Sequence, residues 1–132
     1  MRIALVQMEV EQGKKKENLQ RALGLLGEAA QQGADVAVLP ETPFVGWLAE
    51  EGQGRAETLD GELCSAIGRA ARRENMAVVS GITEKKQGRA YNSAVLFDQQ
   101  GKLLLSYSKV NGWARHYLGL DTYAQGRSLS AY

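Results

Sequence analysis

A short apolar run that stops at a proline limits what this chain can fold into. The run from Val36 to Leu39 follows the turn signal Gly33-Ala34-Asp35, and Pro40 comes directly after it. Such a run between turn residues is typical of a strand buried on both faces, and proline ends it because proline lacks the N–H donor. Glu41 is therefore expected at the carboxyl end of a strand, where open α/β sheets bind their ligands.

Glu41 is the first candidate for chemistry. Its neighbours Pro40, Pro43, Phe44 and Trp47 are apolar and would remove part of the water around the carboxyl group. Desolvation raises the pKa of a carboxylic acid and makes its carboxylate a better base. The alternative is a surface glutamate that begins a loop, and position alone leaves both readings open.

The order of the expected elements predicts an α/β fold with a mixed sheet. A strand–helix–strand unit comes first, which favours parallel strands with a right-handed crossover. The expected strands are 2–8, 36–39, 76–81, 91–98 and 102–108, and the expected helices are 17–32 and 60–75. Gly33 is expected to end the first helix, Asp60 to cap the second, and Gln99-Gln100-Gly101 to form a hairpin turn.

Two stretches carry no clear element. Residues 42–58 form a long loop, and loops of this length are usually functional or mobile. From Val110 onward the strand pattern is lost, and both Asn111-Gly112-Trp113 and Gly119-Leu120-Asp121 are typical of loops.

Composition excludes several classes of function. The 132 residues suit a single domain, and a formal net charge of +1 gives no indication of a nucleic-acid or membrane-surface partner. No apolar run approaches the roughly 18 residues of a membrane span, and the N-terminus does not resemble a signal peptide. Cys64 is the only cysteine, so no internal disulfide can form and a cytoplasmic location is expected.

No cofactor or metal is expected from the sequence. A nucleotide-binding domain is disfavoured because no glycine-rich phosphate loop follows any expected strand. His116 and Cys64 lie far apart and do not suggest a metal site, so His116 is interpreted as a surface or pocket-rim residue.

Lys109 is the second candidate for chemistry. It follows the strand expected at 102–108, so it too leaves the sheet at a strand end, and it can share an edge with Glu41. A lysine beside a glutamate in a partly dry cleft would stay charged and could stabilise an oxyanion. The alternative is an ordinary exposed lysine.

Several spaced segments resemble one family. The stretch Val-Leu-Pro-Glu-Thr-Pro-Phe-Val-Gly-Trp at 38–47 resembles the glutamate motif of the nitrilase superfamily, the carbon–nitrogen hydrolases. Residues 3–8, Asn18, 79–84, Tyr91-Asn92-Ser93-Ala94, Gly101-Lys102 and Tyr107-Ser108-Lys109 resemble further family blocks in the same order. The resemblance covers about residues 3 to 110.

The resemblance implies a four-layer α-β-β-α sandwich and a Glu-Lys-Cys triad. Glu41 matches the glutamate that acts as general base, and Lys109 matches the lysine that stabilises the tetrahedral intermediate. The implied substrate is a small amide, nitrile or N-carbamoyl compound, with small neutral or amine-bearing amides as the first expectation.

The nucleophile of that triad is missing from the sequence. No cysteine follows Lys109, and Cys64 precedes it on an expected helix beside Leu63, where a structural role is expected. Residues 1–132 are therefore interpreted as one incomplete domain, the N-terminal half, which is inactive alone. The alternative is a non-catalytic binding or assembly module that pairs sheet to sheet with itself or a relative as a homo-oligomer.

Overall fold

The computed structural model describes residues 1–47, 52–111 and 123–129, which fold around a five-stranded sheet. The strands lie in sequence order, with β1 to β3 parallel and β3 to β5 antiparallel. The mixed α/β sheet expected from the sequence is therefore confirmed. In chain order the elements are β1 (Ile3–Leu5), α1 (Lys15–Gln31), β2 (Val36–Val38), α2 (Gly52–Arg55), α3 (Glu62–Glu74), β3 (Ala77–Lys86), β4 (Arg89–Phe97) and β5 (Leu103–Ser108).

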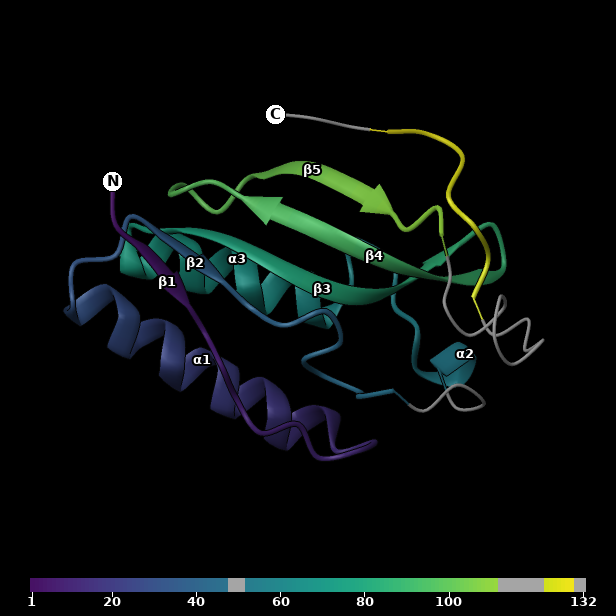
Figure 1. Cartoon of the computed structure of the whole chain (residues 1–132), viewed down its shortest axis with the longest axis horizontal. Helices are drawn as coiled ribbons and strands as arrows, with labels where there is room; N and C mark the ends of the chain where they lie inside the picture. The colour runs from purple at the N-terminus through teal and green to yellow at the C-terminus, as the bar shows by residue number, and fades with distance from the viewer. Residues whose placement is uncertain (48–51, 112–122, 130–132) are drawn as a thin grey trace.

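The two long helices cover one face of the sheet (Figure 1). On α1, the buried apolar residues are Ala22, Leu26 and Ala29, which recur at the spacing of one face of a helix. On α3, the buried residues include Leu63, Cys64, Ile67, Ala70 and Ala71. These side chains pack on Ala37, Val78, Val95 and Phe97 of the sheet. The result is one helix layer and one sheet layer of the expected four-layer sandwich.

The opposite face of the sheet remains partly open among the described residues. Ala37 of β2 is fully buried on the helix face, whereas Val36 and Val38 are only half-buried on the other face. In β1, Ile3 and Leu5 pair with those two valines and are 51% and 82% exposed. The prediction that β2 is buried on both faces is therefore wrong for the described residues, because α1 and α3 both lie on one side.

The helix boundaries depart slightly from the expected ones. Helix α1 begins two residues earlier, at Lys15, and ends before Gly33, whose φ of +76° is the left-handed conformation expected there. Helix α3 begins at Glu62, and the prediction of Asp60 as its N-cap is wrong. The Leu63 N–H instead donates to the Glu57 carboxylate at 3.0 Å.

The β3–β4 hairpin is longer than the sequence predicts. Strand β3 continues past Gly81 to Lys86, and a two-residue turn at Gln87 and Gly88 returns the chain into β4. Both turn residues have positive φ, +51° and +74°, which matches the twist of a two-residue hairpin. This turn is not predicted from the sequence because Gln-Gly is a weaker hairpin signal than Asn-Gly.

The second hairpin forms where it is expected. Gly101 adopts φ +78°, and the Asp98 carboxylate accepts hydrogen bonds from the N–H groups of Gln100 and Lys102. Strands β4 and β5 are consequently held in antiparallel register.

Residues 123–126 lie beside the sheet, near β4 and the end of β5 (Figure 1). Ala124 forms a bridge with Tyr91, and the Gly126 N–H donates to the Lys109 carbonyl at 2.9 Å. The expected loop at Gly119-Leu120-Asp121, most of Asn111-Gly112-Trp113, and His116 lie outside the described residues. No helix within the described ranges is both long and apolar enough to cross a membrane.

Candidate active site

Strand direction explains how Glu41 and Lys109 come to the same edge of the sheet. Strand β2 runs parallel to β3, and two antiparallel steps through β4 make β5 parallel to them as well. The carboxyl ends of β2 and β5 therefore point the same way, although three strand spacings of about 4.8 Å each separate them. The loop after β2 must cross β3 before Glu41 can meet Lys109.

Gly81 makes that crossing possible. The Gly81 N–H donates to the Pro40 carbonyl at 3.2 Å, so the backbone just before Glu41 is still hydrogen-bonded to β3. A Cβ atom at Gly81 would lie 1.7 Å from the backbone oxygen of Glu41, far inside van der Waals contact. Glycine is therefore required here for close backbone approach rather than for an unusual φ.

Two side chains converge on one oxygen of Glu41. The Asn92 side-chain amide donates to Oε1 of Glu41 at 2.8 Å, and Nζ of Lys109 pairs with the same oxygen. The structure thus brings together Glu41 and Lys109, the two candidates from the sequence, and adds Asn92 from β4.

Asn92 had no assigned role in the sequence analysis, although its segment contributed to the family resemblance. Strand β4 runs antiparallel to β3, so an early residue of β4 lies at the edge where β2 and β5 end. The sequence shows a polar residue early in this strand, but only the pairing of β3 with β4 shows that its side chain lies beside Glu41.

Lys109 is held on two sides. Besides Glu41, its Nζ lies 5.8 Å from the centroid of the Trp47 ring, within the range of a cation–π interaction. The Lys109 side chain is 34% exposed and the Glu41 side chain is 43% exposed. The Glu41 carboxylate is therefore partly removed from water, as expected, while Pro43 and Phe44 are themselves buried in the protein.

A cavity of about 470 Å³ opens beside these three groups. Its wall combines Glu41, Asn92 and Lys109 with apolar or small residues, among them Leu39, Val79, Ala94 and Tyr107. Ligand sites commonly combine an apolar wall with a few converging polar groups. The arrangement suits a small molecule with a polar reacting group and an apolar body.

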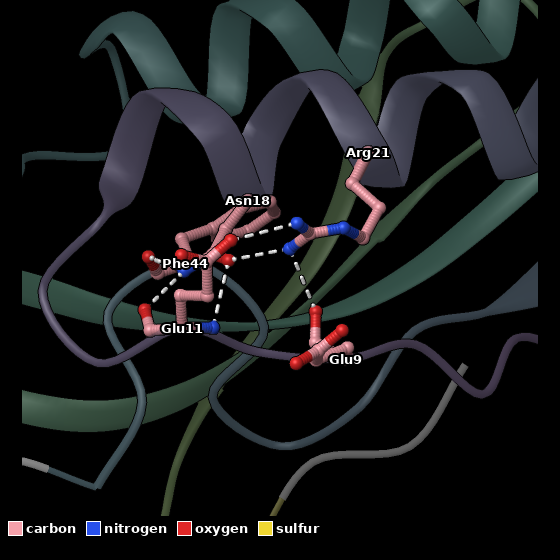
Figure 2. A network of polar contacts seen from close by, with 5 residues as sticks. All are labelled: Glu9, Glu11, Asn18, Arg21 and Phe44. Atoms are coloured by element: carbon pink, nitrogen blue, oxygen red, sulfur yellow. Dashed lines mark hydrogen bonds and ion pairs between the residues drawn. The ribbon is translucent and has the colours of Figure 1, made fainter.

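The side chain of Asn18 forms hydrogen bonds that hold the loop after β2 in place (Figure 2). Its side-chain amide donates to the carbonyl oxygens of Glu11 at 2.7 Å and Phe44 at 2.9 Å. Its Oδ1 accepts from the Glu11 N–H at 3.0 Å and from Arg21 at 3.1 Å. Because Asn18 is fully buried and Phe44 is three residues from Glu41, this network fixes the start of the long loop.

Cys64 lies away from these groups. It is 3% exposed on α3, which covers the helix face, whereas Glu41 passes over Gly81 on the opposite face. Burial, together with the negative charges of Glu57, Glu84 and Asp60, raises the pKa of its thiol to about 11. A thiol with this pKa supplies almost no thiolate near neutral pH, which agrees with the structural role expected for Cys64. Within the described ranges, no three His, Cys, Asp or Glu residues are grouped as a metal ion would require.

The family profile described as carbon-nitrogen hydrolase matches residues 2–127. The chain belongs to the carbon-nitrogen hydrolases. It is 33% identical over 130 residues to the omega-amidase of Bos taurus, an alignment that covers 98% of this chain and 47% of that protein. It is 36% identical over 114 residues to an (R)-stereoselective amidase of Pseudomonas sp., covering 86% of this chain and 41% of that protein.

Solved carbon-nitrogen hydrolases share the fold. A superfamily protein from Xanthomonas campestris, with an arsenic adduct in its active site, superposes with a TM-score of 0.84 at 27% identity. That superposition covers 96% of this carbon-nitrogen hydrolase chain and 46% of the other. An amidase from Nesterenkonia sp. has the same fold, with a TM-score of 0.83 at 23% identity over 97% of this chain and 49% of its own. The chain thus spans about half the length of these relatives.

Proposed function

We propose that this chain supplies Glu41 and Lys109 to the Glu-Lys-Cys active site of a hydrolase that cleaves carbon–nitrogen bonds other than peptide bonds. The observation that carries the proposal is the contact between Nζ of Lys109 and Oε1 of Glu41 beside the cavity. These residues are 68 positions apart and leave different strands, so the contact depends on the whole sheet.

In the proposed reaction, Glu41 accepts the proton of a cysteine thiol while the sulfur attacks the carbonyl carbon of an amide. The carbonyl oxygen becomes an oxyanion, which the Lys109 ammonium stabilises by hydrogen bonding and charge. Collapse of the tetrahedral intermediate breaks the carbon–nitrogen bond, and the proton held by Glu41 passes to the leaving amine. Water then attacks the thioester with Glu41 again as base, which releases the acid and restores the thiol.

The nucleophile of this scheme is not Cys64, because burial and a pKa of about 11 keep its thiol protonated. The sulfur would come from polypeptide that follows residue 132 or from a second chain. The 132-residue chain alone is then expected to bind substrate weakly and to leave it intact.

A small amide is the proposed substrate. The relatives include an omega-amidase and an (R)-stereoselective amidase, and both names refer to amide cleavage. The cavity of about 470 Å³ is large enough for a molecule of that class. Nitriles and N-carbamoyl compounds are the competing substrate classes. The proposed location is the cytoplasm. The single cysteine, Cys64, is free and buried, and a protein without an internal disulfide suits a reducing compartment.

The test is ammonia release from small aliphatic amides, measured on the product of the coding sequence read past Tyr132 and on the 132-residue chain alone. The longer product should hydrolyse amides in preference to nitriles and N-carbamoyl compounds, and Glu41→Gln or Lys109→Met should reduce its kcat by at least about a thousandfold. Full activity in either variant would remove these residues from the reaction. Activity of the short chain that disappears with Cys64→Ala would contradict the structural role of Cys64.

The open face of the sheet favours a second candidate, a non-catalytic binding or assembly module. Ile3 and Leu5 expose apolar side chains on the face that α1 and α3 leave uncovered. Two copies, or one copy and a relative, could bury these faces against each other as packed sheets do. Sedimentation of the 132-residue chain would show a dimer that Leu5→Lys dissociates. A folded, strictly monomeric chain at micromolar concentration would remove this candidate.

A further inference from the structure

A second carboxylate, that of Glu84, is buried in the sheet outside the candidate active site. Glu84 is 3% exposed near the end of β3, and Ile82, two residues earlier, lies in the hydrophobic core. Alternation along a strand places Glu84 on the same face as Ile82, which is the face covered by the helices. A buried carboxylate is costly unless hydrogen bonds compensate for its lost water.

Serine hydroxyls from two neighbouring strands supply those hydrogen bonds. Ser93 of β4 donates to Oε2 of Glu84 at 2.6 Å, and Ser106 and Ser108 of β5 reach the same oxygen at 3.4 Å. The hydroxyl oxygens of Ser93 and Ser108 also lie 3.1 Å apart. One oxygen of Glu84 therefore joins β3 to both strands that follow it.

These serines are the direct neighbours of the groups that contact Glu41. Ser93 follows Asn92, and Ser108 precedes Lys109. Ser93 and Ser108 face each other across β4 and β5, and the Lys109 N–H donates to the Asn92 carbonyl at 2.8 Å. Because successive residues of a strand point to opposite faces, fixing the serines on one face orients Asn92 and Lys109 on the other.

We propose that Glu84 is a positioning residue for the candidate active site. Its carboxylate, bonded to serines on the helix face, holds the ends of β4 and β5 so that Asn92 and Lys109 both reach Oε1 of Glu41 on the opposite face. The link to catalysis rests on the function proposed above, but the positioning itself is a property of the folded 132-residue chain and can be measured without any reaction.

The experiment is native-state hydrogen exchange of the 132-residue chain with Glu84→Ala and Glu84→Gln. Loss of the carboxylate should speed exchange of the Lys109 N–H about tenfold or more relative to the Ala70 N–H of α3, because a local opening costs less than global unfolding. Glutamine keeps an oxygen acceptor at the same place and should restore most of the protection. Leu26→Ala, a change in the core of α1, is the control for a purely global loss of stability.

Equal acceleration at Lys109 and Ala70 in Glu84→Ala, as expected for Leu26→Ala, would overturn the proposal. If Glu84→Ala does not fold, Ser108→Ala is compared in the same way. The exchange rate of the Lys109 N–H should then rise severalfold relative to that of the Ala70 N–H, and an unchanged ratio would contradict the proposal.

In the longer gene product, Glu84→Ala should lower kcat more than it raises KM, and Glu84→Gln should restore kcat. Failure of the amidase assay in the unaltered protein would refute the proposed function and leave the exchange result standing.

Discussion

Asn92 and Lys109 are joined by a backbone hydrogen bond of 2.8 Å, and their side chains contact the same carboxylate oxygen of Glu41. The residues that meet there come from the loop after β2, from β4 and from the end of β5. Within the part of the chain that the structure describes, both contacts fall on Oε1, so neither of them occupies the second oxygen of Glu41, which can act as a base.

Asn92→Ala should reduce kcat/KM of the longer gene product about 10- to 100-fold in the amide assay, because a hydrogen bond to a charged group is lost. Asn92→Asp, which has nearly the same shape, should lose more, since a second carboxylate would repel Glu41. Thermal unfolding should report folded protein in both cases. An Asn92→Ala variant with unaltered kinetics would show that the contact has no part in catalysis.

Gly81→Ala should disrupt the crossing of the Glu41 loop over β3. A Cβ atom there would overlap the Glu41 backbone oxygen at 1.7 Å, so the loop or the strand must move, at a cost of several kcal/mol of unfolding free energy. Urea denaturation gives the difference. The matched control is Gly24→Ala on the exposed side of α1, where an added Cβ would meet nothing within 4 Å beyond the adjoining backbone of its own helix. That change should stabilise the chain by about 0.5–1 kcal/mol, since alanine favours helix.

Asn18→Ala should lower the free energy of unfolding by about 2–4 kcal/mol, because the buried carbonyl of Phe44 and the N–H of Glu11 lose their hydrogen bonds to the Asn18 side chain. Gln20→Ala, on the exposed side of the same helix, is the control and should change stability by less than about 0.5 kcal/mol. Urea denaturation measures both. Similar values for the two variants would mean that the network in Figure 2 contributes little to stability.

Stability should fall in acid partly through Glu57. Burial raises the pKa of this carboxyl, but hydrogen bonds from Lys15 and the Leu63 N–H, with the charge of Lys15, outweigh it and lower the pKa below the ordinary 4.5. The unfolded chain therefore takes up the proton first as the pH falls. The contribution of Glu57 to the free energy of unfolding is therefore complete above about pH 4.5, and it is lost as the pH falls through the lower pKa of the folded chain. Urea denaturation of the unaltered chain and Glu57→Gln from pH 7 to 3 should show the two curves converging in acid; a constant gap would contradict this.

Cys64 should resist alkylation in the folded chain. At pH 8 its thiol is buried and protonated, since its pKa is about 11, so iodoacetamide should react at least about a hundredfold more slowly than with the urea-unfolded chain. Mass spectrometry follows the modification. Rapid alkylation under native conditions would show an accessible thiolate and reopen a nucleophilic role.

Much of the scaffold could be predicted because local sequence controls it. The stripe Ala22, Leu26 and Ala29 gives α1 at helical spacing, Pro40 ends β2, and Gly101 turns the second hairpin. The features that the sequence analysis missed depend on distant partners. Glu57, rather than Asp60, caps α3, because the segment before the helix pairs with Thr83 and Lys85 of β3 and brings that carboxylate to Leu63.

The sequence by itself determined which residues end strands, and therefore that Glu41 and Lys109 stand at sheet edges, because proline, glycine and apolar periodicity act within a few residues. Only the tertiary structure decided that they meet. Asn92 is 51 positions from Glu41 and Lys109 is 68, and their contact needs the β2-β3-β4-β5 order and the space left above Gly81. Strand order and close backbone approach are relations between segments, and a local pattern does not contain them.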